Sequence, residues 1–243
     1  MAYTNETPPV VCERHDPNGN LFYCDSDTLI IPGLFYQANF LTEEEEKQIL
    51  SIIDSNEWNH DIQRKTQYYG YTYYHTRHNS TSMQPTEQIE NTHFPLSQLQ
   101  FVIDKFKDTT IFPPDHPPTQ ILVNEYLRNM SIKGHVDNVD AFGDVIISLS
   151  LCGPAYMTMR SIENPNIVAK VFMEERSILI MSGDSRFKWR HAITKQRRVY
   201  LPTKKITILR DDTYRRVSLT IREIKIEGTK KVREGEEDCN RVY

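Results

Sequence analysis

Three side chains in the second half of the sequence have the types and spacing of a metal site. His135 and Asp137 are two residues apart, so in an extended chain the imidazole and the carboxylate point to the same side. His191, 54 residues after Asp137, offers a second imidazole. Two imidazoles and one carboxylate on one face of an ion are typical of a non-haem Fe(II) centre with open positions for further ligands. An H-x-D pattern also occurs by chance, and a lone histidine is more often a surface residue.

Two arginines near the C-terminus are spaced for one face of a strand. Arg216 and Arg222 are six residues apart, and even spacing puts both on the face opposite Val217, Leu219 and Ile221. Inward guanidinium groups in a small barrel are costly without anions to satisfy them. A dicarboxylate co-substrate would supply such anions, because guanidinium forks bind carboxylates well. The alternative is an edge strand with exposed arginines.

Asn124 and Tyr126 form a further polar pair ahead of the H-x-D motif. They share a face of a predicted strand, and each can donate a hydrogen bond to a co-substrate carboxylate. The alternative is an ordinary pair of strand residues.

The ordered set N-x-Y, H-x-D, a distant histidine and R-x5-R resembles the AlkB family of oxidative nucleic-acid dealkylases. The segment Gly183-Asp184-Ser185-Arg186 is similar to the same family. The resemblance covers residues 29–226 and implies a double-stranded β-helix (jelly-roll) core. It also implies Fe(II) as the metal, 2-oxoglutarate and O2 as co-substrates, and His135, Asp137 and His191 as the catalytic metal ligands.

The resemblance also implies how the co-substrate is held. Arg216 would pair with the distal carboxylate of 2-oxoglutarate, and Arg222 would lie near its other end, close to the metal. Asn124 and Tyr126 would complete the hydrogen-bonding shell around the co-substrate.

A dense aromatic tract with basic neighbours lies earlier in the chain, at residues 64–75. Aromatic faces stack on bases and basic side chains hold phosphate. The tract lies where the resemblance to the AlkB family implies an aromatic nucleotide-recognition lid. The target base would come from single-stranded nucleic acid or be flipped out of a duplex. The candidate substrate contacts are Arg64, Tyr69, Tyr71 and Tyr73. The alternative is a β-hairpin with cross-strand aromatic pairs.

The resemblance implies oxidative removal of alkyl groups from DNA or RNA bases, as in repair or demethylation. The segment Ala141-Phe142-Gly143-Asp144 and residues 64–74 are similar to the branch that hydroxylates a modified wobble uridine in tRNA. That activity is one alternative, and an oxygenase acting on a protein side chain is another. A non-catalytic binding module is a third, which the intact metal and arginine residues disfavour.

The elements that must position these residues follow an α+β order. Thr42 and Glu45 form a capping-box signature for a helix to about Asp54, and a second helix is expected at Leu96–Lys107. Short β-branched runs separated by turns then predict a sandwich or barrel. The predicted strands are Gln120–Tyr126, Asp144–Cys152, Tyr156–Arg160, Ile167–Phe172, Ser177–Met181, Lys205–Leu209 and Val217–Ile226. We expect a jelly-roll core with the N-terminal helices packed on one sheet.

The composition favours a globular protein inside the cell, in the cytoplasm or the nucleus. The chain has 243 residues, 38% of them hydrophobic, and no apolar run of membrane-spanning length, so no membrane partner is expected. Four scattered cysteines favour a reducing compartment. We expect a flexible arm at residues 1–28, the dioxygenase domain at 29–227 and a charged tail at 228–243. The oligomeric state is left open.

The net charge of −4 hides an uneven distribution. Residues 186–222 hold twelve lysines or arginines and only two acids, Asp211 and Asp212. Such a run is most often a solvated face. Beside an active site it can also hold the phosphates of a nucleic acid.

Overall fold

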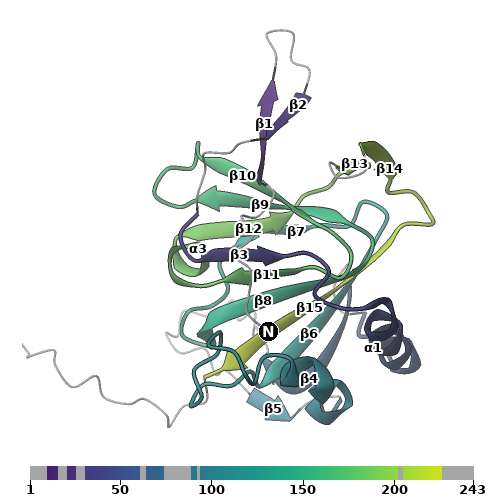
Figure 1. Ribbon diagram of the computed structural model, residues 1–243, viewed down its shortest axis with the longest axis vertical. Coiled ribbons are helices and arrows are strands. Elements are labelled where there is room, and N and C mark those ends of the chain that lie inside the picture. Colours follow the sequence, from purple (N-terminus) through teal and green to yellow (C-terminus); the bar gives the residue numbers. More distant parts are fainter. Residues whose placement is uncertain are drawn as a thin grey trace, which may run out of the picture.

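Two antiparallel β-sheets form the body of the protein (Figure 1). The structure is a computed structural model that describes residues 10–15, 21–25, 31–60, 64–73, 89–91, 94–201 and 205–225. Within these residues the larger sheet contains, in spatial order, β3 (Leu34–Gln37), β11 (Ile178–Met181), β8 (Phe142–Cys152), β15 (Arg215–Ile224), β6 (Gln120–Leu127), β4 (Lys65–Tyr73) and β5 (Ile89–Asn91). The smaller sheet contains β2 (Leu21–Asp25), β1 (Val10–His15), β10 (Val168–Met173), β9 (Ala155–Ser161), β12 (Trp189–Ile193) and β7 (Ile132–His135). A separate hairpin pairs β13 (Arg198–Leu201) with β14 (Ile206–Leu209).

The helices are few and short, as expected for an α+β jelly roll. The longest is α1 (Glu43–Ser55), and it starts with the predicted capping box, in which Thr42 and Glu45 each satisfy the other's backbone N–H. The second predicted helix is split into a 3₁₀ turn, η1 (Leu96–Leu99), and α2 (Gln100–Asp104). The split follows from Leu99, whose φ of −116° and ψ of 21° interrupt the helical geometry. A further helix, α3 (Gly183–Phe187), leads into β12.

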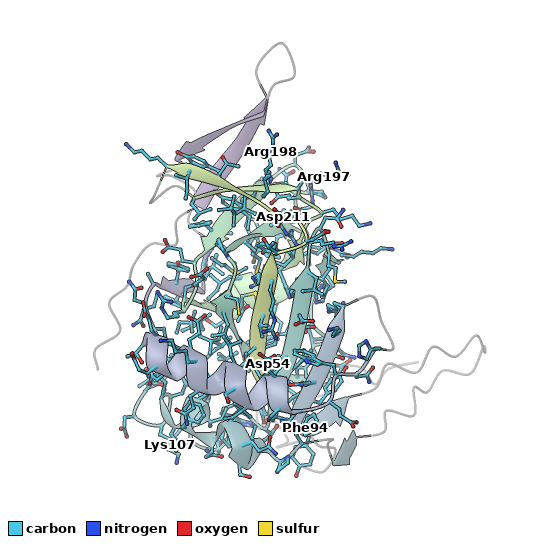
Figure 2. All side chains as sticks on the ribbon, turned by 90° about the vertical axis from the view of Figure 1, so that its right-hand side faces the viewer. Asp54, Phe94, Lys107, Arg197, Arg198 and Asp211 are labelled. Carbon is cyan, nitrogen blue, oxygen red and sulfur yellow. The ribbon has the colours of Figure 1, made fainter. Side chains whose placement is uncertain are left out.

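The outer face of the larger sheet packs against the N-terminal helices. α1 lies across this face (Figure 2), and its buried Ile49 and Ile53 belong to one apolar cluster with Val217, Leu219 and Ile221 of β15. The predicted alternation in β15 is therefore confirmed. Because neighbouring residues of a strand point to opposite faces, the even-numbered residues of β15 point into the space between the sheets.

A second apolar cluster fills the space between the two sheets. Ile146 and Leu179 come from the larger sheet, and Met157, Met159 and Val171 come from the smaller one. All five side chains are buried. Since flexible methionines fill irregular gaps, they suit a core in which polar residues of β15 also face inward.

The N-terminal residues differ in part from the expected arm. β1 and β2 lie within residues 1–28, and β1 pairs with β10 through Val10 and Val11. The β-branched pair suits an extended strand, and β1 also pairs antiparallel with β2. The other residues of the expected arm and the tail at 228–243 lie outside the described residues.

No helix in the described ranges is both long and apolar enough to cross a bilayer.

The capping box of α1 yields a stability prediction. Thr42→Ala removes the hydroxyl that accepts the Glu45 N–H, at 3.1 Å, and we expect the free energy of unfolding to fall by about 1 kcal/mol in urea denaturation. Thr42→Ser keeps the hydroxyl and should retain most of the stability. An equal loss in both variants would show that the Thr42 methyl group, and not the cap, matters.

Candidate active site

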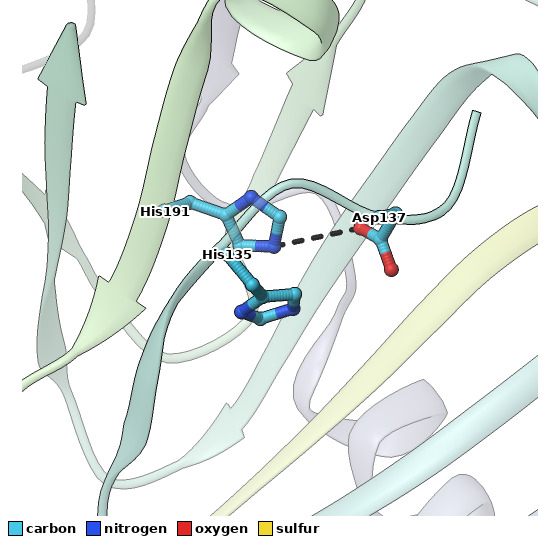
Figure 3. Close-up of side chains that lie close together, drawn as sticks. All are labelled: His135, Asp137 and His191. Carbon is cyan, nitrogen blue, oxygen red and sulfur yellow. Dashed lines mark ion pairs between the residues drawn. The ribbon is translucent and has the colours of Figure 1, made fainter. Parts of the chain in front are cut away.

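The three predicted metal ligands meet between two neighbouring strands of the smaller sheet (Figure 3). His135 ends β7, His191 lies in the middle of β12, and the two residues are directly paired across the antiparallel ladder. Their rings are 4.4 Å apart between centroids. Asp137 follows in the loop after β7, and its Oδ2 is 3.5 Å from His191 Nε2. One potential ligand atom from each residue lies within 4.8 Å of the others, so the cluster has the dimensions of a metal site.

The protonation states of the cluster fit a divalent metal. Burial lowers the pKa of His191 from 6.5 to about 4, which leaves its imidazole neutral at pH 7. Burial alone would raise the pKa of Asp137, but attraction, chiefly by the Arg222 guanidinium, outweighs it, and the pKa of this carboxyl is lowered. His135 Nδ1 lies 2.8 Å from the Lys133 carbonyl, which can only accept, so Nδ1 donates and Nε2 is the nitrogen left for a metal. Neutral imidazoles and an ionised carboxylate are the forms that bind metal.

A buried arginine fixes the loop that carries Asp137. Arg186 of α3 is 3% exposed, and its guanidinium donates to the carbonyls of Asp137, Asn138 and Gly143 at 2.9, 3.3 and 3.3 Å. α3 directly precedes β12, which carries His191. Arg186 therefore ties the loop of one ligand to the segment that positions another.

Arg222, on β15 of the larger sheet, bonds to the cluster of His135, Asp137 and His191. Its Nη1 donates to Asp137 Oδ1 at 2.6 Å, and its Nε donates to Gln120 Oε1 at 2.8 Å. The guanidinium carbon lies 3.5 Å from the centroid of the Phe142 ring. The structure thus places Arg222 beside the metal cluster, where the sequence analysis expected it.

Arg216 lies on the same inner face of β15, further along the strand. Its side chain is 1% exposed, its Nη2 donates to Ser150 Oγ at 3.1 Å, and its guanidinium carbon lies 5.4 Å from the centroid of the Tyr126 ring. Its Nε is buried and finds no hydrogen-bond partner in the described part of the chain. A buried guanidinium with spare donors is a binding group for an anion such as a carboxylate.

Asn124 and Tyr126 share this inner face, as predicted. In the β6–β15 ladder Asn124 is opposite Ser218 and Tyr126 is opposite Arg216. Both residues are buried. The side-chain Oδ1 of Asn124 accepts a hydrogen bond from Arg64 Nε at 2.7 Å. Arg64, which we expected to contact the substrate, thus bonds to a residue that we expected to contact the co-substrate.

The structure corrects part of the predicted lid. Tyr69 is fully buried among the helices, and its hydroxyl bonds to Asn56 and Gln67, so its ring cannot stack on a base. Alternation along β4 explains the error, because Tyr68, opposite Leu122 of β6, points to the inner face instead.

Tyr71 does lie near the candidate site. Gly70, with a φ of +85°, interrupts the regular strand just before it. Tyr71 packs against the buried cluster of Ala141, Phe142 and Ile224, which includes the ring of Phe142 that Arg222 covers. The side chain of Tyr73 lies outside the described residues.

Sequence reasoning assigned no role to three residues that support the site. These residues are Gln120, Phe142 and Arg186. Gln120 shares the inner face of β6 with Asn124. Because the two residues are an even number apart, the strand pattern could have predicted this. The contacts of Phe142 and Arg186 depend on tertiary packing, which the sequence pattern does not show.

The arrangement has counterparts among known proteins. Residues 33–222 match the family model described as "2OG-Fe(II) oxygenase superfamily". The "Alkylated DNA repair protein ALKBH8 homolog" of Arabidopsis thaliana is 29% identical over 217 residues, which are 81% of this chain and 60% of that protein. The "tRNA (carboxymethyluridine(34)-5-O)-methyltransferase alkbh8" of Xenopus tropicalis is 30% identical over 175 residues, which are 68% of this chain and 26% of that protein. This chain thus spans at most 60% of the length of either relative.

A solved structure confirms the fold independently. "The structure of OsALKBH1" superposes with a TM-score of 0.54 at 16% identity and covers 81% of this chain and 100% of that chain. At this level of identity the likeness shows a common jelly-roll fold.

The pKa of His191 yields a prediction for the metal-free protein. A histidine with a pKa of about 4 when folded and 6.5 when unfolded binds more protons in the unfolded state between these values. We therefore expect the free energy of unfolding to fall by roughly 1.4 kcal/mol per pH unit between about pH 6 and pH 4 from this residue. Asp137, with a lowered pKa, contributes a loss only below about pH 4, the ordinary range for aspartate.

Urea denaturation in the presence of a chelator, at half-unit pH steps, would measure this slope. His191→Gln removes the titrating group and should flatten the curve between pH 6 and pH 4. An unchanged slope in this variant would show that another group causes the loss of stability.

Proposed function

Because the chain belongs to the 2OG-Fe(II) oxygenase superfamily, whose chemistry uses Fe(II), 2-oxoglutarate and O2, we propose that it hydroxylates an alkyl carbon on a nucleic-acid base. The observation that carries the proposal is the juxtaposition of two groups. The His135, Asp137 and His191 cluster and the guanidinium of Arg216 face one interior, and Arg222 lies on the same strand face as Arg216 and bonds to Asp137.

His135, Asp137 and His191 would hold the iron. Three protein ligands leave positions open for the co-substrate and for oxygen. When bound, iron and 2-oxoglutarate supply the oxidant, since 2-oxoglutarate and O2 yield succinate, CO2 and one oxygen atom for a substrate C–H bond. Arg222 would keep the Asp137 carboxylate ionised and aligned through its 2.6 Å hydrogen bond. The protein thus contributes ligands, their orientation and a site with little access to water.

Arg216 would hold the distal carboxylate of 2-oxoglutarate. Its buried Nε has a free donor, and a carboxylate would accept from Nε and from the outer nitrogens in fork geometry. The Tyr126 hydroxyl and the Asn124 amide lie on the same face and can add hydrogen bonds. This assignment leaves Arg64 with a supporting role, because it bonds to Asn124.

Removal of an alkyl group follows from the position of the new hydroxyl group. If the oxidised carbon is an N-methyl group, the resulting N–CH2OH loses formaldehyde and the base regains its N–H. The relative from Arabidopsis thaliana is named a repair protein for alkylated DNA, which supports this reaction class. Tyr71, beside Phe142, is our candidate for contact with the base.

Hydroxylation of a modified tRNA uridine is the second candidate. Val139, two residues after Asp137, is 44% exposed and offers an apolar group beside the metal loop. Bases methylated on a ring nitrogen that normally pairs often carry a positive charge, which an acidic neighbour would stabilise and a valine would not. The relative from Xenopus tropicalis is named for a reaction on a carboxymethyluridine of tRNA, which supports a modified tRNA uridine as the substrate.

Incubation of the protein with Fe(II), 2-oxoglutarate and methylated single-stranded DNA or RNA tests the proposal. We expect succinate and formaldehyde in equal amounts, and nucleoside mass spectrometry should show restored bases. His135→Gln should lower succinate production at least about 100-fold while the circular dichroism spectrum stays unchanged. Full activity in this variant would refute the metal assignment.

The products separate the alternatives. A nucleoside that gains one oxygen and releases no formaldehyde would favour the uridine hydroxylase. Succinate formation that no nucleic acid stimulates, but that a protein extract does, would favour a protein side chain as the substrate.

Arg216 yields a second prediction. Arg216→Met removes the charge-assisted hydrogen bonds to the co-substrate, and we expect the KM for 2-oxoglutarate to rise about 10- to 100-fold. Arg215→Met is the matched control, because Arg215 points outward and pairs with Asp54 and Glu125. The control should lower thermal stability and leave this KM unchanged. Equal effects of the two variants would remove the assignment of Arg216.

A further inference from the structure

A hollow of about 500 Å³ lies where the chain leaves β6 and where it enters and leaves the β13–β14 hairpin. Arginine dominates its lining, with Arg128, Arg197, Arg198 and Arg210, against one acid, Asp211. Three of these four arginines belong to the basic run at residues 186–222. The active site described above uses none of the four.

The base of the hollow holds a buried positive charge. Arg210 is 4% exposed, and its outer nitrogens donate to the carbonyls of Met130 and Thr194 at 2.8 and 3.4 Å. Its guanidinium carbon lies 4.7 Å from the centroid of the Tyr214 ring. Within the described residues no carboxylate pairs with Arg210, and its buried Nε has no hydrogen-bond partner. A buried guanidinium whose partners are neutral makes the hollow favourable for an anion.

The rim adds exposed arginines. Arg197 and Arg198 are exposed, and neither forms an ion pair within the part of the chain that the structure describes. Arg128 pairs with Asp212 at 2.7 Å, but both side chains are more than half exposed, so this ion pair is weak and exchangeable. The Asp211 carboxylate accepts from the N–H and the hydroxyl of Thr213. The positive charge of the rim is therefore available to a ligand.

We propose that this arginine hollow binds the phosphodiester backbone of the nucleic acid whose base enters the active site, an inference that rests on the proposed function. The exposed Arg128 follows β6, and the exposed Arg197 and Arg198 lie where the chain enters the β13–β14 hairpin. Arginines spread in this way can each bind a different phosphate of one strand, which an enclosed site for one small anion would not require. Guanidinium groups bind phosphate oxygens in the same fork geometry as carboxylates.

The position of the hollow sets the length of strand that can use it. Arg197 follows His191 by six residues, and at about 3.3 Å per residue the hollow lies at most roughly 20 Å from the metal cluster. A strand of a few nucleotides is therefore long enough to join a base in the active site to a phosphate in the hollow. A long strand can occupy both places, whereas a trinucleotide centred on the modified base offers only the phosphates next to that base.

The test compares two double variants that each remove two positive charges. Arg197→Gln with Arg198→Gln alters the hollow, and Lys47→Gln with Lys107→Gln alters exposed residues of the helical region. Figure 2 shows Arg197 and Arg198 at one end of the molecule and Lys107 at the other. Binding of a fluorescent single strand of about 20 nucleotides is measured by anisotropy over a range of KCl concentrations, with Mn(II) and 2-oxoglutarate present.

Loss of two phosphate contacts should weaken binding roughly 20-fold at about 0.1 M salt and lower the slope of log K against log salt by about 1.4. The control double variant should change the affinity less than about twofold. In turnover assays, the advantage in kcat/KM of the long methylated strand over a methylated trinucleotide should shrink in the arginine double variant alone.

The outcomes distinguish failure of this inference from failure of the proposed function. If the wild-type protein oxidises nucleic acid but the arginine double variant keeps its affinity, salt slope and preference for the long strand, the hollow is not a docking site. If wild-type protein binds inorganic phosphate at micromolar concentration and Arg197→Gln with Arg198→Gln abolishes only that binding, the hollow takes a small anion instead. If wild-type protein oxidises no nucleic acid under any condition, the proposed function itself fails.

Discussion

One ionised carboxylate, that of Asp137, connects the two sheets at the candidate active site. It accepts from Arg222 of the larger sheet at 2.6 Å and lies 3.5 Å from His191 of the smaller sheet. Arg186 holds the backbone of the same residue. A buried carboxylate is costly unless it is paired and hydrogen-bonded, and Arg222, with the backbone held by Arg186, meets that need for Asp137. The β7–β12 ladder fixes the cross-strand pair of His135 and His191, and the anchored Asp137 completes the set of three ligands.

Strand β15 supplies side chains both to the core of the protein and to the candidate binding groups. The odd-numbered residues of β15, such as Val217 and Leu219, pack under the helices, while Arg216 and Arg222 face the interior. At the Arg222 end, the positive charge is matched by Asp137. At the Arg216 end, no acid within the described residues pairs with the guanidinium, and its Nε has no hydrogen-bond partner there. This difference in charge pairing distinguishes the two ends of the interior. A carboxylate of a dicarboxylate ligand would gain more electrostatic stabilisation at the Arg216 end, where the positive charge is unmatched.

The sequence predicted those parts of the molecule that depend on local periodicity. The capping box of α1 and the two faces of β15 follow from spacing alone, and the structure confirms both. β7 and β12 escaped prediction, although they carry two of the metal ligands. Their sequences, Ile-Lys-Gly-His and Trp-Arg-His-Ala-Ile, are too short and too mixed for an alternation of period two. Tyr69 was placed on the wrong face because an aromatic run shows that tyrosines alternate but not which of them face the core.

Arg210 of the arginine hollow interacts electrostatically with Arg216, the residue that we propose binds the co-substrate. Arg210 and Arg216 repel one another, and Tyr126 and Tyr214 lie beside them. Each guanidinium covers a tyrosine ring and donates to neutral oxygens, which spreads the charge without cancelling it. Two buried cations persist in one region only if the folded chain offsets their repulsion elsewhere, and the large apolar core of the neighbouring sheets supplies that stability. The fold therefore places unmatched positive charge at Arg216 and at Arg210, and we propose that a carboxylate binds the first and a phosphate the second.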